Sequence, residues 1–304
     1  MSQRRRVVID CDPGIDDALA LWLAAASPEL EILGVCCVAG NRPVELTARN
    51  ACKVLDAAGR GSVPVHVGCA RPIAHVLPRS NTVHGDDGLG GVPLPTARKP
   101  NALHALDFLS QTLLDAPPGT LTLIALGPLT NLALAEIRHP GLLRRARDVL
   151  VMGGAAFRRG NATPHAEFNF HADATAAHVV LGCEATVTLF TLDVTEQAAM
   201  SPAWMASLDA SSSTCSRMAH AMLGAYAAQE ASLHDPCPVA YAIDSLLFEC
   251  EPWITDVDWH AGTTEGRLHA VRPPKGRACN TRLAVTVDSA RLLPLVRERL
   301  GRLP

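Results

Sequence analysis

Two hydrophobic patterns alternate along the chain. Short, nearly continuous apolar runs predict buried strands, and apolar residues three or four positions apart predict helices. The predicted strands cover residues 6–9, 31–38, 63–67, 120–126, 148–152 and 186–192. The predicted helices cover residues 17–26, 44–58, 101–115, 129–137 and 172–181. This alternation predicts an α/β fold, with a mostly parallel central sheet and helices on both of its faces.

Polar and small residues mark some element boundaries. Asn101 is a good N-cap residue, so we expect the third helix to begin there. Gly59 directly follows the second helix and suits a helix C-terminus, and the polar stretch 210–214 is predicted to be a loop. The sequence has no repeat and no low-complexity linker, and 304 residues suit one large α/β unit. We therefore expect a single domain over residues 1–304.

Composition narrows the range of partners. Hydrophobic residues make up 48% of the chain, which is enough for a sizeable core, and the formal net charge is only −3. Without a long basic run, a nucleic-acid partner is not expected. Only three apolar residues separate Arg6 from Asp10, too few for a signal peptide, and no run of about 18 apolar residues suggests a membrane span. We therefore expect a cytoplasmic protein without a membrane partner.

The ten cysteines include no Cys-x-x-Cys pair. Several of them, such as Cys36 and Cys37, lie within apolar runs. We interpret them as small buried hydrophobic residues in a reducing compartment, because a disulfide framework is improbable in a long chain with a good core.

Polar clusters follow the predicted strands. In parallel sheets, ligands bind beyond the carboxyl ends of the strands, so these clusters should meet at one edge. The first strand is followed by Asp12, Asp16 and Asp17, and the second by Asn41. The later strands are followed by the segment GPLTN (127–131), by the Gly-Gly pair 153–154, and by a loop that holds Asn161, Glu167 and Asn169.

Four aspartates, at positions 10, 12, 16 and 17, lie within eight residues around a Pro-Gly turn. Two carboxylates about 4 Å apart repel by roughly 4 kcal/mol at an effective dielectric constant near 20. Either some of them stay protonated or a cation lies among them, and hard divalent cations prefer oxygen ligands. The alternative is that the aspartates only cap the following helix in a solvated loop. The spacing does not match an EF-hand.

Seven segments resemble the inosine–uridine-type nucleoside hydrolases, and they occur in the expected order over nearly the whole chain. They are DCDPGIDDALAL (10–21), VAGN (38–41), HGDDGLGG (84–91), LGPLTN (126–131), VMGGA (151–155), AEFNFHAD (166–173) and LHDPCPVAYAI (233–243). The resemblance implies a nucleoside hydrolase-like (Rossmann-like) fold. It also implies an enzyme that hydrolyses the N-glycosidic bond of ribonucleosides and assembles as a homotetramer or homodimer.

The resemblance further implies a set of ligands for Ca²⁺ and ribose. Ca²⁺ would be held by Asp12, Asp17, Asp235 and the backbone carbonyl of Leu126, with Asp12 as the general base on a bound water. Asp16 and Asn41 would bind the 2′- and 3′-hydroxyls. The remaining ribose contacts would come from Met152, which lines the sugar pocket, and from Asn161, Glu167 and Asn169, with Glu167 and Asn161 toward the 5′-hydroxyl.

The departing base needs its own contacts. His234 directly precedes Asp235, and with the resemblance we favour a leaving-group role for it over a helix-entry histidine without a proton role. A purine-preferring branch of the family carries tryptophan before this aspartate, so the chain resembles the inosine–uridine or pyrimidine-using branch. His84 is the second candidate for a base contact.

The segment before His234 departs from the family pattern because it is short and poor in aromatic residues. Only Tyr226 could form an aromatic wall over the base, while Met218 and Met222 could line the pocket or pack in the core. Asp86 and Asp87 add charge near the entrance. These departures concern the preferred base and not the class of reaction.

Three other functions are weighed against nucleoside hydrolysis. A non-catalytic, Ca²⁺-dependent nucleoside- or ribose-binding protein would keep the diol contacts but lack a working base. A metal-dependent phosphohydrolase would need Lys or Arg near the aspartates, and residues 7–41 contain neither. Dinucleotide binding is disfavoured because the first turn, DPGIDD, lacks the G-x-G-x-x-G pattern.

Overall fold

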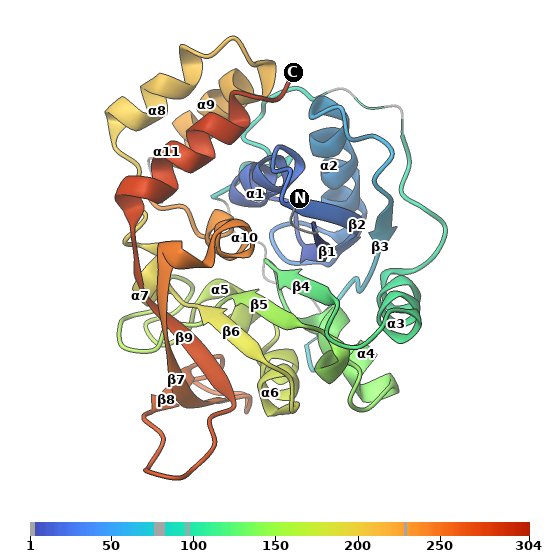
Figure 1. Ribbon diagram of the computed structural model, residues 1–304, viewed down its shortest axis with the longest axis vertical. Coiled ribbons are helices and arrows are strands. Elements are labelled where there is room, and N and C mark those ends of the chain that lie inside the picture. Colours follow the sequence, from blue (N-terminus) through green and yellow to red (C-terminus); the bar gives the residue numbers. More distant parts are fainter. Residues whose placement is uncertain (1–3, 76–82, 95, 97, 228–229) are drawn as a thin grey trace.

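A computed structural model describes residues 4–75, 83–94, 96, 98–227 and 230–304. Within these residues a sheet of nine strands has the order β3-β2-β1-β4-β5-β6-β9-β7-β8 (Figure 1). The strands are β1 Arg5–Cys11, β2 Leu30–Cys37, β3 Val65–Val67, β4 Leu121–Ala125, β5 Asp148–Met152, β6 Val187–Phe190, β7 Phe248–Val257, β8 Leu268–Val271 and β9 Thr281–Val287.

The sheet is mostly parallel, as the sequence predicts. Every pair from β3 to β9 along the sheet is parallel, and only the pairs β7–β9 and β7–β8 are antiparallel. Strand β1 pairs with β2 on one side and with β4 on the other. The strand order therefore reverses between β1 and β4, and the loops that follow these two strands diverge there. Such a switch point is where α/β sheets bind ligands.

Helices cover both faces of the sheet, which confirms the predicted architecture. Helices α1, α2, α9, α10 and α11 lie on one side, and α3, α4 and α6 lie on the other (Figure 1). The α-helices are α1 Ile15–Ala25, α2 Val44–Ala57, α3 Ala105–Asp115, α4 Thr130–Arg138, α5 Phe168–Ala172, α6 Ala174–Gly182, α7 Leu192–Thr195, α8 Pro202–Asp209, α9 Thr214–Tyr226, α10 Pro236–Ile243 and α11 Ser289–Leu300. Two 3₁₀ turns are η1 Leu143–Arg145 and η2 Ser245–Leu247.

Side chains of β1 alternate between two hydrophobic cores. Val7 and Ile9 pack in the core beneath α1 and α2, and Val8 packs in the core on the opposite face. Trp22 is fully buried in α1, and its Nε1–H donates to the carbonyl of Val54 in α2 at 2.8 Å. The first half of the sheet is thus covered by two tightly joined helices, which fix the loop between β1 and α1.

Two predicted helix boundaries are wrong. The third helix begins at Ala105, where the His104 side chain accepts the N–H of Leu106, and not at Asn101. Asn101 instead donates its N–H to the carbonyl of Val65 at 2.7 Å, which holds the chain extended beside β3. The helix predicted over residues 172–181 is interrupted at Asp173, whose side chain accepts the N–H of Ala176 and begins α6.

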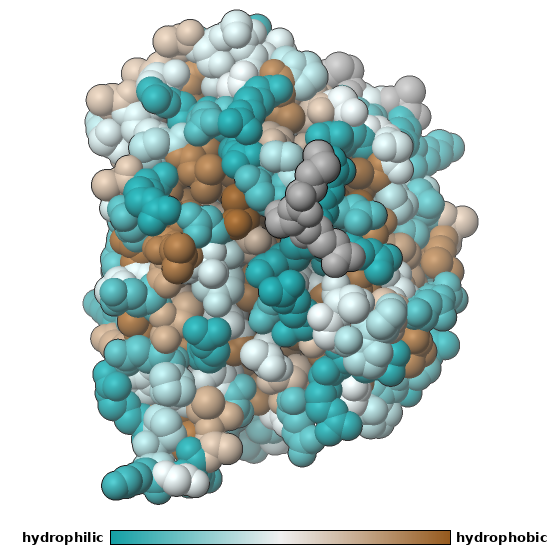
Figure 2. All heavy atoms as spheres, viewed as in Figure 1, coloured by the Kyte–Doolittle hydropathy of each residue, from teal (hydrophilic) through white to brown (hydrophobic). Residues whose placement is uncertain are grey.

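The ten cysteines all lie within the described residues, and all are free thiols. In the part of the chain described, no helix is long and apolar enough to cross a bilayer. On the face drawn in Figure 2, hydrophobic side chains form separate patches among hydrophilic ones. Met222 is fully buried in the core of α1 and α9, and Met218 packs against it. Both methionines therefore pack in the core, and neither is among the residues that line the cavity described below.

Candidate active site

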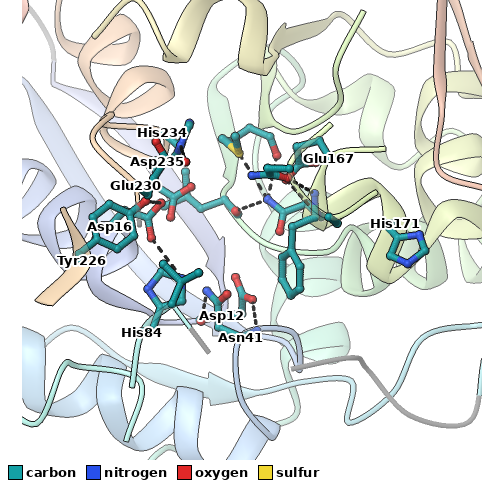
Figure 3. A pocket seen from close by; sticks show the side chains of 17 residues that line it. Asp12, Asp16, Asn41, His84, Glu167, His171, Tyr226, Glu230, His234 and Asp235 are labelled. Atoms are coloured by element: carbon teal, nitrogen blue, oxygen red, sulfur yellow. Dashed lines mark hydrogen bonds and ion pairs between the residues drawn. The ribbon is translucent and has the colours of Figure 1, made fainter. Parts of the chain in front are cut away.

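A cavity of about 510 Å³ opens at the carboxyl ends of the parallel strands (Figure 3). It collects residues from segments that are far apart in the sequence. The predicted site residues that line it are Asp12, Asp16, Asn41, His84, Leu126, Met152, Asn161, Glu167, Asn169, Tyr226, His234 and Asp235. Asp17, the remaining predicted residue, is fully buried in the first turn of α1.

The Asp12 carboxylate lies in a slot between two glycines. Its Oδ2 accepts the backbone N–H of Asn41 at 2.6 Å. A Cβ added at Gly40 or at Gly127 would lie 2.9 Å from Asp12 Cγ, closer than ordinary contact allows. Burial raises the pKa of Asp12 well above its usual range, and the Asp17 carboxylate raises it further. The two strand-end glycines therefore let a buried carboxylate reach the cavity.

The Asp17 side chain stabilises the β1–α1 turn by hydrogen bonds to its backbone. Its Oδ2 accepts the N–H of Gly14 at 2.9 Å, and its Oδ1 accepts that of Asp12 at 3.3 Å. An acidic side chain at the third helical position that accepts the N–H of the N-cap residue is one half of a capping box. Asp17 therefore has the capping role that was weighed for the aspartates. Burial, followed by the neighbouring Asp16, raises the pKa of Asp17 to about 7.

Asp10 serves a different purpose from the other three aspartates. Asn131 of the LGPLTN segment donates from Nδ2 to Asp10 Oδ2 at 2.7 Å and to the carbonyl of Cys37 at 3.1 Å. The Oδ1 of Asn131 accepts the N–H of Cys69 at 2.9 Å. Burial raises the pKa of Asp10 to about 8. Asp10 and Asn131 together tie the ends of β1 and β2 behind the cavity floor.

A metal ion could be held by three buried carboxylates. One oxygen each of Asp16, Asp17 and Asp235 lies within 4.8 Å of the others. Burial raises the pKa of Asp235 well above its usual range, and the nearby Asp16 and Asp17 charges add to this. Crowded, desolvated carboxylates are the donor set that suits a hard divalent cation, so the residues fit such a group.

This cluster differs in part from the predicted ligand set. Asp17 and Asp235 belong to both, but the third carboxylate of the cluster is Asp16 rather than Asp12. Asp12 and Leu126 line the same cavity. The Leu126 carbonyl accepts Nδ2 of Asn169 at 2.7 Å, so this oxygen already lies against the polar residues of the opposite wall.

Glu167 and Asn169 form a rigid wall opposite the aspartates. Glu167 precedes α5, and its carboxylate accepts the backbone N–H groups of Asn169 at 2.7 Å, Gly154 at 2.8 Å and Phe170 at 3.1 Å. Burial nevertheless raises the pKa of Glu167. Asn161 is exposed at the rim, where its Oδ1 accepts the N–H of Phe168 at 2.9 Å.

His84 and Tyr226 stack on each other at another wall, with ring centroids 5.5 Å apart and planes at 21°. The hydroxyl of Tyr226 donates to Asp16 Oδ2 at 3.4 Å, and His84 Nε2 lies 3.9 Å from Asp16 Oδ1. His84 Nδ1 accepts the N–H of Ile15 at 3.1 Å, and burial lowers the pKa of His84. Both observations fit a neutral ring with its proton on Nε2.

His234 lies between a hydroxyl and a carboxylate. Its Nδ1 is 2.7 Å from Thr195 Oγ1, and its Nε2 is 3.3 Å from Glu230 Oε2. The second contact is an ion pair when the ring is protonated. Burial favours the neutral ring, but the carboxylates of Glu230, Asp16 and Glu167 together raise the pKa of His234.

Sequence reasoning missed several lining residues, namely Val83, Ala162, Phe168, His171 and Glu230, and it missed Thr195 beside His234. Glu230 carried a usable signal, because it stands four residues before His234 in the segment already singled out. Thr195 carried none, since only the folded sheet brings α7 next to His234. His171 lies within the segment AEFNFHAD quoted above, although it was not itself predicted to line the site.

The fold and the cavity define an α/β enzyme with an acidic site at the switch point of a parallel sheet. The chain belongs to the inosine-uridine preferring nucleoside hydrolase family, whose sequence model matches residues 7–294. It is thus a hydrolase of N-ribosyl bonds, and the resemblance stated from the motifs is confirmed.

Three relatives illustrate the similarity. The inosine-uridine preferring nucleoside hydrolase of Leishmania major is 34% identical and covers 98% of each chain. The pyrimidine-specific ribonucleoside hydrolase RihB of Escherichia coli O157:H7 is 32% identical and covers 97% of each. The solved structure of a plant nucleoside hydrolase superposes with a TM-score of 0.92 at 31% identity, over 98% of this chain and 99% of that one.

Proposed function

We propose that the protein catalyses Ca²⁺-dependent hydrolysis of inosine- and uridine-type or pyrimidine ribonucleosides to ribose and the free base. The observation that carries this proposal is the single cavity that joins the Asp12 slot, the buried carboxylate cluster and the Glu167–Asn169 wall to His84, Tyr226 and His234. The names of the Leishmania and Escherichia coli relatives support these substrate classes.

Cleavage of an N-glycosidic bond builds positive charge on the ribose as the base departs. Fixed carboxylates around the ring stabilise that charge electrostatically. Asp12 takes a proton from the attacking water, and general-base assistance of this kind contributes about 10²–10⁴-fold. Asp12, Asp17, Asp235 and the Leu126 carbonyl would hold Ca²⁺, which when bound would lower the pKa of water and orient the ribose diol. Direct attack by water inverts the anomeric carbon.

The ribose hydroxyls are assigned to the remaining polar groups. Asp16 and Asn41 bind the 2′- and 3′-hydroxyls, and Asp16 is kept in place by the Tyr226 hydroxyl. Glu167 and Asn161 lie toward the 5′-hydroxyl, while Asn169 and Met152 complete the sugar pocket. The Glu167 carboxylate accepts three backbone N–H groups, which orient it for this contact.

The departing base leaves toward the histidine side of the cavity. His234 donates from Nε2 to the base, a role supported by the place of this residue in the cavity lining. Tyr226 forms the aromatic wall over the base. His84, stacked on Tyr226, is the second base contact.

The proposal extends to the organisation of the protein. One sheet that contains all nine described strands supports a single domain over residues 1–304. The ten free thiols support a reducing compartment such as the cytoplasm. A homotetramer or homodimer is proposed from the family resemblance, and sedimentation of the purified protein tests it.

Release of reducing sugar from a panel of ribonucleosides tests the proposed reaction. Wild-type protein should release ribose, and Asp12→Asn should lower kcat by about 10² or more while the thermal unfolding curve stays cooperative. Asp86→Asn is the matched control, because Asp86 is exposed and lies outside the cavity lining. Turnover by Asp12→Asn within about tenfold of wild type would remove Asp12 from the role. A wild-type protein that binds nucleosides without cleaving them would be the binding protein weighed above.

A further inference from the structure

One carboxylate of the cavity wall is not used by the proposed reaction. Glu230 lines the cavity next to His234, and its side chain is 24% exposed. Figure 3 shows Glu230, His234 and Tyr226 on the same side of the cavity, across from Glu167. With Glu230 Oε2 3.3 Å from His234 Nε2, the wall presents a hydrogen-bond acceptor directly beside a donor.

Hydrogen bonds hold Glu230 and the three residues that follow it. Its own N–H donates to the carbonyl of Tyr226 at 2.9 Å, and its Oε1 accepts the N–H of Ser232 at 3.2 Å. Residues 231–233 then pair antiparallel with residues 198–200, through hydrogen bonds of 2.7 and 3.2 Å. One oxygen of Glu230 is therefore engaged by the backbone, while Oε2 lies beside His234. An acceptor held in this way is preorganised for recognition.

The charge of Glu230 fixes its hydrogen-bonding character. The side chain is 24% exposed and its Oε1 accepts the N–H of Ser232, and both features favour the ionised carboxylate. An ionised carboxylate can only accept hydrogen bonds. A base that turned lone pairs toward Oε2 would leave two acceptors facing each other in a partly desolvated site, which is unfavourable.

We infer that Glu230 is a specificity-determining residue that, together with His234, selects nucleobases carrying an acceptor next to an N–H. The inference rests on the proposed function and names the feature of the base that this site recognises. Lactam edges have this arrangement: the carbonyl oxygen and N3–H of uracil, and the 6-oxo group and N1–H of hypoxanthine. His234 Nε2–H donates to the carbonyl oxygen, and Glu230 Oε2 accepts the N–H.

Matched substrates isolate this contact. Purine riboside lacks the 6-oxo group of inosine and carries an unprotonated N1, so it removes the N–H without adding bulk. Uridine and 3-methyluridine form the corresponding pyrimidine pair. The two members of a pair also differ in leaving-group ability, and a change at Glu230 acts on this difference through His234. The ratio of their kcat/KM values is therefore compared between wild type and Glu230→Gln together with the ratio of the inhibition constants of the two free bases, whose binding involves no bond cleavage.

Wild-type enzyme should favour inosine over purine riboside, and uridine over 3-methyluridine. Glu230→Gln should lower each ratio by about tenfold to a hundredfold, the range typical of a hydrogen bond to a charged group. Glu196→Gln is the control: Glu196 is electrostatically coupled to both Glu230 and His234 but lies outside the cavity lining, so the ratios should not change.

A purely structural role for Glu230, holding the turn before His234, predicts a different result. Both members of each pair, and nitrophenyl riboside as well, would then slow by one common factor. Equal slowing, or unchanged ratios in Glu230→Gln, overturns the inference. Nitrophenyl riboside, whose leaving group has no lactam edge, distinguishes a wrong role for Glu230 from a wrong proposed function. A wild-type protein that cleaves neither nitrophenyl riboside nor any nucleoside contradicts the proposed function, and the inference about Glu230 is then wrong as well.

Discussion

The substitution Gly127→Ala tests whether catalysis depends on the position of the Asp12 carboxylate in its slot. Gly127 has no positive φ, so its backbone conformation is one that alanine adopts without strain. The new Cβ would lie 2.9 Å from Asp12 Cγ, whereas ordinary contacts are 3.4–4 Å. The carboxylate must therefore retreat by about 0.5–1 Å, toward Gly40 on its other side, where space is equally short.

Gly127→Ala should lower the activity of the enzyme more than its stability. A displacement of about 1 Å in a reacting group can cost about 10²-fold in rate, so Gly127→Ala should lower kcat for inosine or uridine by roughly that factor. Overpacking in a well-packed interior costs about 1–3 kcal/mol of unfolding free energy, a loss that a protein of this size can tolerate. Ribose release and denaturant unfolding of the same preparation measure the two effects.

Gly182→Ala is the matched control, since, apart from its chain neighbours and the nearby backbone of its own helix, no described heavy atom lies within 4 Å of the added Cβ. It makes the same chemical change at the end of α6, away from the cavity, and should leave kcat unchanged. If folded Gly127→Ala hydrolyses nucleosides within about threefold of Gly182→Ala, then the placement of Asp12 does not limit the reaction, and the role given to the slot is wrong.

Three further predictions concern the metal, the sugar and the base. Protein purified without chelator should contain about one divalent cation per chain, and chelation should abolish an activity that added Ca²⁺ restores; a fully active metal-free preparation would contradict this. Uridine should be cleaved up to ~10⁴-fold faster than 2′-deoxyuridine, because a site built to bind a hydroxyl rejects the analogue without it; equal rates would exclude a diol contact. His234→Ala should slow uridine strongly and nitrophenyl riboside weakly, because a good leaving group needs little help; equal slowing of both would assign His234 to positioning.

Much of the architecture followed from local sequence patterns. The apolar runs of β1, β4 and β5 are nearly continuous because parallel strands are buried on both faces, and this property can be read along the chain without knowing the partners. The same holds for α1 and α2, whose extents differ from the predictions by one or two residues. Helix starts were less well determined. Asn101 is a good cap residue, but its backbone N–H is used by β3, a partner that is distant in sequence.

The sequence also identified most of the cavity, because residues at the carboxyl ends of parallel strands must converge. It placed Asp12, Asn41 and the segment 127–131 together from strand ends alone, whereas Leu126 came from the family resemblance. Spacing could not decide which carboxylates lie closest together, since Asp12 and Asp16 both follow the first strand. Spacing favoured neither, whereas the folded turn brings Asp16 to Asp17 and Asp235.

Only the tertiary structure revealed the contacts between segments that share no pattern. Thr195 reaches His234 from α7, and Gly40 and Gly127 contact Asp12 from the loops that follow β2 and β4. Periodicity records whether a residue is buried but not what it is buried against. The sequence alone therefore predicted which residues are buried. Only the assembled strands determine which donor lies beside each acceptor and how much space is left for the Asp12 carboxylate.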